Sequence, residues 1–221
     1  MTYKEEFFFG LLQVAHRVLR DVTPPQGKAD ATFLFGEMPE NQDGVLAKAA
    51  QLIAEGCVGS LYLSELHGRG FPPHALLWKD ELAKRGVPKD SIICIVGDFL
   101  ENPSTYSEVQ FLMHQRPNAW RTLYIIAEPF HQLRAFCTLA SEIITTGTDL
   151  WVYNATPNQS DWLEPVTHSN GRTKDIRAGM IVHELERIWK YHDEGRGNIL
   201  HPSCLVEYLN ERDRTRQQAR Q

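Results

Sequence analysis

The sequence predicts a single α/β domain, spanning 1–211, whose mostly parallel, five-stranded sheet carries helices on both faces. Short apolar runs alternate along the chain with segments of helical apolar spacing, and glycine or proline marks most of the boundaries between them. Runs such as 92–96 are apolar throughout, which is typical of strands that are covered on both sides. The length of 221 residues also suits one domain.

The positions of the apolar residues define the expected elements. In the segment 44–55, Val45, Ala49 and Leu52 keep helical spacing, and Gly56 follows as a helix-terminating residue. The same reasoning applies throughout the core, which we place at 29–154. We expect strands at 31–35, 58–63, 91–96, 121–127 and 149–153, alternating with helices at 44–55, 73–85, 103–115 and 129–145.

The two ends of the chain add helices outside this core. The segment 3–22 contains an apolar cluster at 7–12 that acidic rather than basic residues precede, so we interpret it as an amphipathic helix packing on the domain. Docking of this helix on a membrane surface is the alternative. After a polar loop at 155–172, C-terminal helices are expected within 173–210, and the Arg-rich tail 212–221 is expected to be disordered.

The composition of the chain limits the kinds of binding partner that we expect for it. The formal net charge of −5 gives no sign of wholesale attraction to nucleic acid, and no apolar run approaches the ~20 residues that span a bilayer. No two of the four cysteines share the spacing of a zinc knuckle. We therefore expect a soluble, cytoplasmic protein whose partner is a small-molecule ligand. The sequence leaves its metal requirement and its oligomeric state open.

Polar side chains follow every expected strand. In an open parallel sheet, ligands bind beyond the carboxyl ends of the strands, where the strand order changes direction. The residues that follow the strands are therefore the candidate ligand-binding groups. In chain order they are Gly36 and Glu37, then Ser64, Glu65, His67 and Arg69, then Asp98, Thr105 and Glu108, then Glu128, His131 and Arg134, and finally Asn154.

Common fingerprints of nucleotide binding and hydrolysis are absent. The sequence contains no G-x-G-x-x-G after the first strand, no P-loop and no G-x-S-x-G elbow. A nucleotide-like ligand would then be held differently, for instance by helix N-termini at Ser104 and Phe130.

For three groups of candidate ligand-binding residues, the sequence suggests a specific role in binding and also a structural explanation. Glu65 stands where ribose-binding carboxylates often lie in such sheets, although a solvated loop carboxylate has the same appearance. The glycine-flanked pair His67 and Arg69 suits an anionic group or else belongs to a surface loop. His131 and Arg134 share the first turn of a helix, which suits an anion clamp or a positioned acid/base, or else a helix cap and a salt bridge.

A histidine pair on the late helix is interpreted differently. His183 and His192, with Glu184 and Glu186 between them, do not have a metal-binding spacing, so we expect a solvated helix face.

Three segments resemble one bacterial family. They read GVPKDSI at 86–92, STYSE at 104–108 and AEPFHQLRA at 127–135, and they occur in the order and at the spacings of the YdcF/SanA/ElyC-like family over about 29–153. The chain departs from the family pattern in places. Only Glu108 remains of the segment that follows the third strand, and His74 stands where many members carry Glu.

This resemblance implies a Rossmann-like three-layer sandwich. S-adenosylmethionine binding is attributed to at least one member, and others are linked to envelope biogenesis. By resemblance, Gly36 would allow close backbone approach, Glu65 would bind ribose hydroxyls, and Arg134 with His131 would hold a carboxylate or phosphate. Glu108 would be a general base or a second polar anchor, which makes Glu108 and His131 the candidate catalytic residues.

The leading hypothesis is therefore a protein that binds an adenosyl, nucleotide-like or phosphorylated small molecule, with S-adenosylmethionine as the first candidate. If it is an enzyme, a transferase or hydrolase is expected. One alternative is a non-enzymatic interaction module that uses the loop 155–172 and the N-terminal helix. Another is a phosphoester hydrolase.

Overall fold

The computed structural model describes residues 2–65, 74–96, 104–158, 161–168 and 173–219. Its main sheet has five strands, all parallel, and confirms the predicted fold class. The strands are β1 (Ala31–Leu34), β2 (Leu61–Glu65), β3 (Ile92–Val96), β4 (Thr122–Ile126) and β5 (Trp151–Asn154). Each lies within three residues of its predicted start, and β2 begins the latest relative to the prediction.

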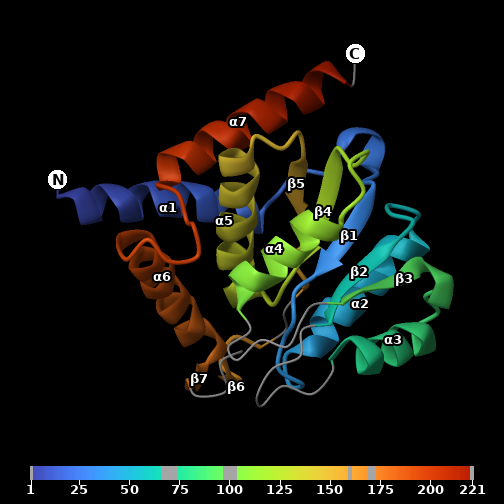
Figure 1. The fold of residues 1–221 in the computed structure, drawn as a ribbon. Coiled ribbons are helices and arrows are strands. Elements are labelled where there is room, and N and C mark those ends of the chain that lie inside the picture. Colours follow the sequence, from blue (N-terminus) through green and yellow to red (C-terminus); the bar gives the residue numbers. More distant parts are fainter. Residues whose placement is uncertain (1, 66–73, 97–103, 159–160, 169–172, 220–221) are drawn as a thin grey trace.

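Helices cover both faces of this sheet and make it the middle of three layers (Figure 1). One face carries α2 and α3, and the other carries α1, α4, α5, α6 and α7. The helices are α1 (Tyr3–Leu19), α2 (Gln42–Ala54), α3 (His74–Lys84), α4 (Thr105–Gln115), α5 (Pro129–Thr146), α6 (Arg177–Asp193) and α7 (Pro202–Gln218), with short 3₁₀ turns η1 (Pro25–Gly27) and η2 (Lys89–Ser91).

The apolar runs of the sequence are explained by burial on both faces. In β1, Phe33 packs into the cluster under α4 and α5, whereas the next residue, Leu34, packs into the cluster under α2 and α3. Successive side chains of a strand point to opposite faces, so a strand covered on both sides needs apolar residues at every position.

The strand order places a switch point between β1 and β4. The order is β3-β2-β1-β4-β5, so the chain moves outward from β1 in one direction and then returns to start β4 on its other side. Leu34 pairs with Ile126 at the carboxyl ends of these two strands. In open α/β sheets, ligands bind in the crevice beyond this point. Gly36 and Glu37 follow β1 there, and α5 starts there directly after β4.

The segment after β5 differs from the prediction. A loop was expected up to residue 172 with a helix from 173, but β6 (Pro165–Thr167) and β7 (Lys174–Ile176) form an antiparallel pair, and α6 starts only at Arg177. The backbone N–H of Arg177 bonds the carbonyl of Glu164 at 2.9 Å. Pairing with β6 in a hairpin therefore replaces the first helical turn that the apolar spacing favoured.

The C-terminal prediction was wrong for residues 212–218. The helix α7, expected to end near Asn210, continues to Gln218. Arg212 is buried on the same face as Leu209, forms an ion pair with Asp21 at 2.6 Å and donates to the carbonyl of Val152 at 2.7 Å. The polar composition suggested disorder, but a buried ion pair holds this part of the helix on the domain.

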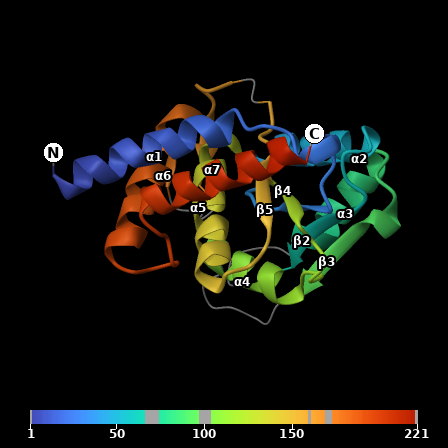
Figure 2. The ribbon, with the colours of Figure 1, turned by 90° about the horizontal axis from the view of Figure 1, so that it is seen from above.

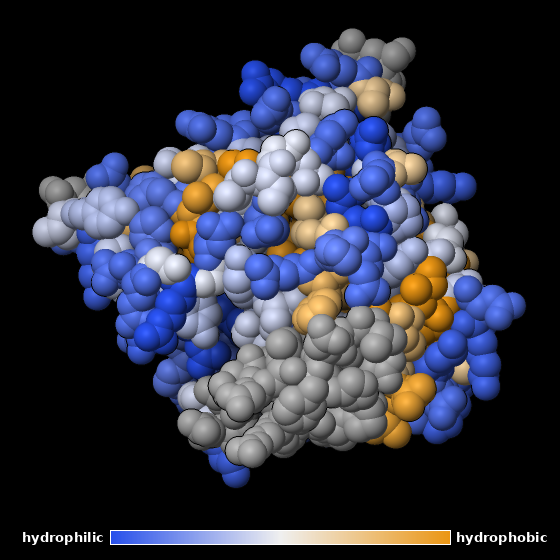
Figure 3. Space-filling view, viewed as in Figure 1, coloured by the Kyte–Doolittle hydropathy of each residue, from blue (hydrophilic) through white to orange (hydrophobic). Residues whose placement is uncertain are grey.

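The N-terminal helix packs on the domain, as predicted. Phe7 and Leu11 are fully buried, and Figure 2 shows α1 and α7 side by side. Only part of the apolar cluster at 7–12 faces the domain, however, because Phe9 is 60% exposed and Leu12 is 58% exposed. Within the described ranges, no helix is long and apolar enough to cross a membrane. Figure 3 shows a further group of exposed apolar side chains over α3 and β3, which includes Leu76.

Candidate functional site

Glu37 is a buried acidic residue at the carboxyl edge of β1 and β4. Its side chain is 1% exposed. The oxygen Oε1 accepts the backbone N–H of Glu128 at 3.0 Å and lies 2.6 Å from Nδ1 of His131. The other oxygen, Oε2, is buried and has no hydrogen-bond partner among the described residues. Burial raises the pKa of Glu37 from 4.5 to about 8, so the side chain is mainly protonated at neutral pH.

Glu108 contributes a second buried carboxyl group from α4. Its Oε1 accepts the backbone N–H of Gly36 at 2.9 Å. Burial raises the pKa of Glu108 to about 8, and the neighbouring Glu37 further disfavours a negative charge. A Cβ atom at Gly36 would lie 3.3 Å from this carboxyl oxygen, so glycine is what permits the close approach. Two carboxyl groups of raised pKa thus flank the backbone at residue 36.

His131 is held as a neutral ring between polar neighbours. It is 2% exposed, and its Nε2 lies 3.0 Å from Oγ1 of Thr105, which is the first residue of α4. Burial, and then the charge of Arg134, lower the pKa of His131 from 6.5 to about 3. The raised pKa of Glu37 and the lowered pKa of His131 agree. The pair is therefore a neutral hydrogen-bonded pair and not an ion pair at pH 7.

Arg134 is buried and fully engaged within the protein. Its Nε and Nη2 donate to the two carboxylate oxygens of Glu184 on α6, and its Nη1 donates to Oγ1 of Thr105. Burial opposes charge on the guanidinium, but Glu184 raises the pKa of Arg134, so it stays ionised. Burial likewise opposes ionisation of Glu184, yet Arg134 and then His168 hold the pKa of that carboxyl well below its usual value. The result is a charged, bidentate pair.

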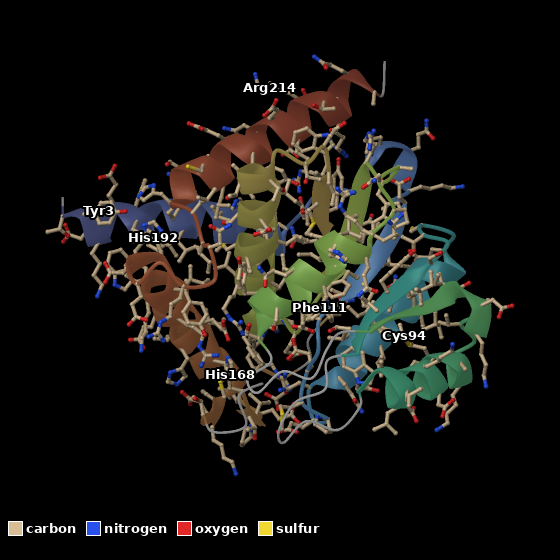
Figure 4. The ribbon with its side chains drawn as sticks, in the orientation of Figure 1. Tyr3, Cys94, Phe111, His168, His192 and Arg214 are labelled. Atoms are coloured by element: carbon tan, nitrogen blue, oxygen red, sulfur yellow. The ribbon has the colours of Figure 1, made fainter. Side chains whose placement is uncertain are left out.

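Residues between β5 and α6 are tied to this edge of the sheet. His168, beside the β6–β7 end of α6, contacts Glu184 through Nε2 (Figure 4). Asn41 donates from Nδ2 to the carbonyl of Thr167 at 2.9 Å. Arg177, the first residue of α6, pairs with Glu128. These three contacts hold the β6–β7 hairpin and the start of α6 near the carboxyl ends of β1 and β4.

The structure brings six of the predicted site residues together. Shared hydrogen bonds and electrostatic interactions connect Glu37, Thr105, Glu108, His131 and Arg134 around Gly36. Whether they contact a ligand stays a prediction.

The other predicted site residues have different outcomes. Glu128 joins the cluster through its backbone N–H, and its side chain pairs with Arg177. Asn154 belongs to a separate set of contacts, since it accepts from Gln132 at 2.9 Å and donates to Asp21 at 2.8 Å.

The second and third strand ends are only partly described. The hydroxyl of Ser64 is buried without a hydrogen-bond partner in the described part of the chain. Glu65 ends β2, but its side chain lies outside what the structure describes. His67, Arg69 and Asp98 lie outside the described residues altogether.

Glu184 is the main residue that the sequence analysis missed. It was assigned to a solvated helix face but is only 1% exposed. A signal was present, because Met180, Glu184 and Ile188 recur every four residues and all three are buried. A carboxylate inside an apolar stripe needs a buried cation, and Arg134 on α5 is that cation.

The described residues include no group of three or more His, Cys, Asp or Glu side chains that could hold a metal ion. No protein-family model matches this chain, and neither does any curated protein. The fold and the local chemistry therefore carry the functional argument.

Proposed function

We propose that this protein binds a nucleoside-like small molecule of the adenosyl type at the carboxyl edge of β1 and β4, with S-adenosylmethionine as the leading candidate. One observation carries the proposal: two buried carboxyl groups, Glu37 and Glu108, both with a pKa of about 8, flank Gly36 at the switch point of the sheet. Strongly shifted carboxyl groups in such a crevice are characteristic of functional sites.

The chemistry of these groups favours a ligand rich in hydrogen-bond acceptors. A protonated carboxyl group donates one hydrogen bond, and the ribose oxygens, ring nitrogens and carboxylate of S-adenosylmethionine are acceptors. Arg134 and Arg177, by contrast, are neutralised by Glu184 and Glu128. These two cations therefore give little net attraction to a triphosphate, which favours an adenosyl ligand over ATP.

Thermal unfolding in the presence of S-adenosylmethionine, adenosine and ATP tests the proposal. A ligand at a hundred times its dissociation constant stabilises the folded state by about 2.7 kcal/mol, which is a readily measured shift in Tm. We expect S-adenosylmethionine and adenosine to raise Tm and ATP to have little effect. Glu108→Ala should abolish the shift, whereas Glu186→Gln, on the exposed face of α6, should keep it. A shift with ATP alone, or with none of the three, would contradict the proposal.

Phosphoester hydrolysis is a second candidate, because an acid with a pKa of about 8 can protonate a leaving group at neutral pH. Release of p-nitrophenol from p-nitrophenyl phosphate, lost in Glu37→Gln, would support it. Activity that is absent, or equal in the two proteins, would refute it.

An interaction module is the third candidate, and it rests on the exposed side chains of Phe9 and Leu163, which are 60% and 72% exposed. It predicts that no small metabolite changes Tm and that Phe9→Ser and Leu163→Ser lower self-association or partner binding. Ligand-induced stabilisation would argue against it.

A further inference from the structure

A chain of hydrogen bonds connects Arg134 through Thr105 and His131 to Glu37. Its donor-to-acceptor direction is set at Arg134. A guanidinium only donates hydrogen bonds. The hydroxyl oxygen of Thr105 accepts from Nη1 of Arg134, so its own proton is available for one donation. Among the described residues, the acceptor in reach is Nε2 of His131, at 3.0 Å. Nε2 is then unprotonated, and the neutral imidazole carries its proton on Nδ1.

The same direction continues to Glu37. Nδ1–H of His131 donates to Oε1 of Glu37 over 2.6 Å, and the backbone N–H of Glu128 donates to the same oxygen over 3.0 Å. An oxygen that receives two N–H groups acts as the carbonyl oxygen of the acid. The acid proton of Glu37 therefore lies on Oε2, which is buried and has no hydrogen-bond partner among the described residues.

The opposite direction satisfies fewer groups. If Oε1 of Glu37 donated to Nδ1 of His131, then Nε2–H would donate to the hydroxyl of Thr105. That oxygen would accept twice, and its own proton would lack an acceptor among the described residues. The backbone N–H of Glu128 would also meet an acid hydroxyl in place of the stronger carbonyl acceptor. Buried polar groups without partners are costly, which favours the first direction.

We infer that Arg134, Thr105 and His131 form a relay of positioning residues that fixes Glu37 as a hydrogen-bond donor, with its acid proton on Oε2 left free for an acceptor atom of the ligand. The ligand part of this inference rests on the proposed function, whereas the direction of the relay does not. It changes the role expected for Arg134 and His131. Both use their polar atoms within the protein and act on a ligand through Glu37.

The direction of the relay is tested first without ligand. Nitrogen-15 NMR of the ring of His131 distinguishes a proton on Nδ1 from one on Nε2. We expect Nδ1 to be protonated in the wild-type protein. Thr105→Val removes the donor to Nε2 and should shift the ring towards the Nε2-protonated form, and Thr215→Val, exposed on α7, should change nothing. A wild-type ring protonated on Nε2 overturns the inference.

The donor role of Glu37 is tested by the pH dependence of binding. Adenosine is the probe, because it has no group that ionises near pH 8. Loss of the Glu37 proton should weaken binding about tenfold for each pH unit above 8, and loss of the proton of the facing Glu108, whose pKa is also about 8, should add to this decrease. Glu37→Gln should bind like the wild type at pH 7 and lack the Glu37 part of the decrease, because the side-chain NH₂ can replace the acid proton. Glu37→Ala should bind weakly at every pH.

The proposed function and the donor role of Glu37 can be refuted independently. If His131 has the expected tautomer but neither adenosine nor S-adenosylmethionine binds, the proposed function is refuted and the relay stands. If adenosine binds to the wild type but Glu37→Gln is as weak as Glu37→Ala, the donor role is refuted and the site stands.

Discussion

Replacing Glu37 with Gln should make the stability of this protein less dependent on pH. In the unfolded chain the carboxyl group ionises near 4.5, whereas burial raises the pKa to about 8 in the folded state. Between these values the folded state keeps a proton that the unfolded state has lost. Stability from this group is therefore complete below pH 4.5 and is lost as the pH rises towards 8.

The size of the effect follows from the shift. Raising the pKa from 4.5 to about 8, at about 1.36 kcal/mol per unit, corresponds to a loss of up to about 5 kcal/mol by pH 8. Domains of this kind have about 5–15 kcal/mol of net stability. Gln does not ionise, so the stability of the variant relative to wild type should rise by several kcal/mol between pH 5 and pH 8.

Urea unfolding of both proteins at pH 5, 6, 7 and 8 measures this difference. Glu186→Gln is the control, because its side chain is exposed on α6 and should give no comparable trend. If the difference between Glu37→Gln and wild type stays constant with pH, Glu37 is ionised in the folded protein and the reasoning is refuted.

Four further substitutions test the packing of the site and the termini. Arg134→Ala removes the bidentate cation of the buried Glu184 and leaves it only His168 and the more distant Arg187, so it should cost about 3–5 kcal/mol in urea unfolding; a loss below 1 kcal/mol would mean that the pair is not buried in solution. Phe7→Ala should lower the free energy of unfolding by about 3–5 kcal/mol because Phe7 is fully buried, whereas Phe9→Ser should change it by no more than about 0.5 kcal/mol. Equal effects would contradict the assignment of a buried and an exposed face to α1. Arg212→Ala should destabilise the protein and expose the end of α7 to proteolysis. Unchanged proteolysis would mean that the ion pair does not hold this segment and would support a disordered tail.

The strands of the sheet could be predicted from the sequence because the apolar run that marks each strand is a local pattern. A strand such as β4 is apolar along its length because both faces are covered, and all four residues from Leu123 to Ile126 are buried. The edge strand β3 is also apolar throughout, but its Ile93 is 36% exposed. The predicted boundaries failed where pairing outside the helical pattern decided them. Lys174–Ile176 was assigned to the late helix but pairs with β6 in a hairpin. Arg212 was assigned to the tail but forms an ion pair with Asp21, which lies far away in the sequence.

The site was predicted in outline for a topological reason. Glu37, Glu108 and His131 follow different strands, and a parallel sheet brings those carboxyl ends to one edge. Their protonation could not be predicted, because the pKa values of about 8 for both carboxyl groups come from burial that only the packed structure defines. The pairing of Arg134 with Glu184 was missed because α6 returns to the site from fifty residues along the chain.

Carbon-13 NMR of the Glu37 side-chain carboxyl group, titrated over pH with and without adenosine, measures whether Glu37 is a protonated donor at neutral pH. We expect a pKa of about 8 in the free protein, and a higher pKa with adenosine bound, because an acceptor on the ligand stabilises the protonated acid. A carboxyl group that titrates at its ordinary value near 4.5, unchanged by adenosine, would contradict this expectation.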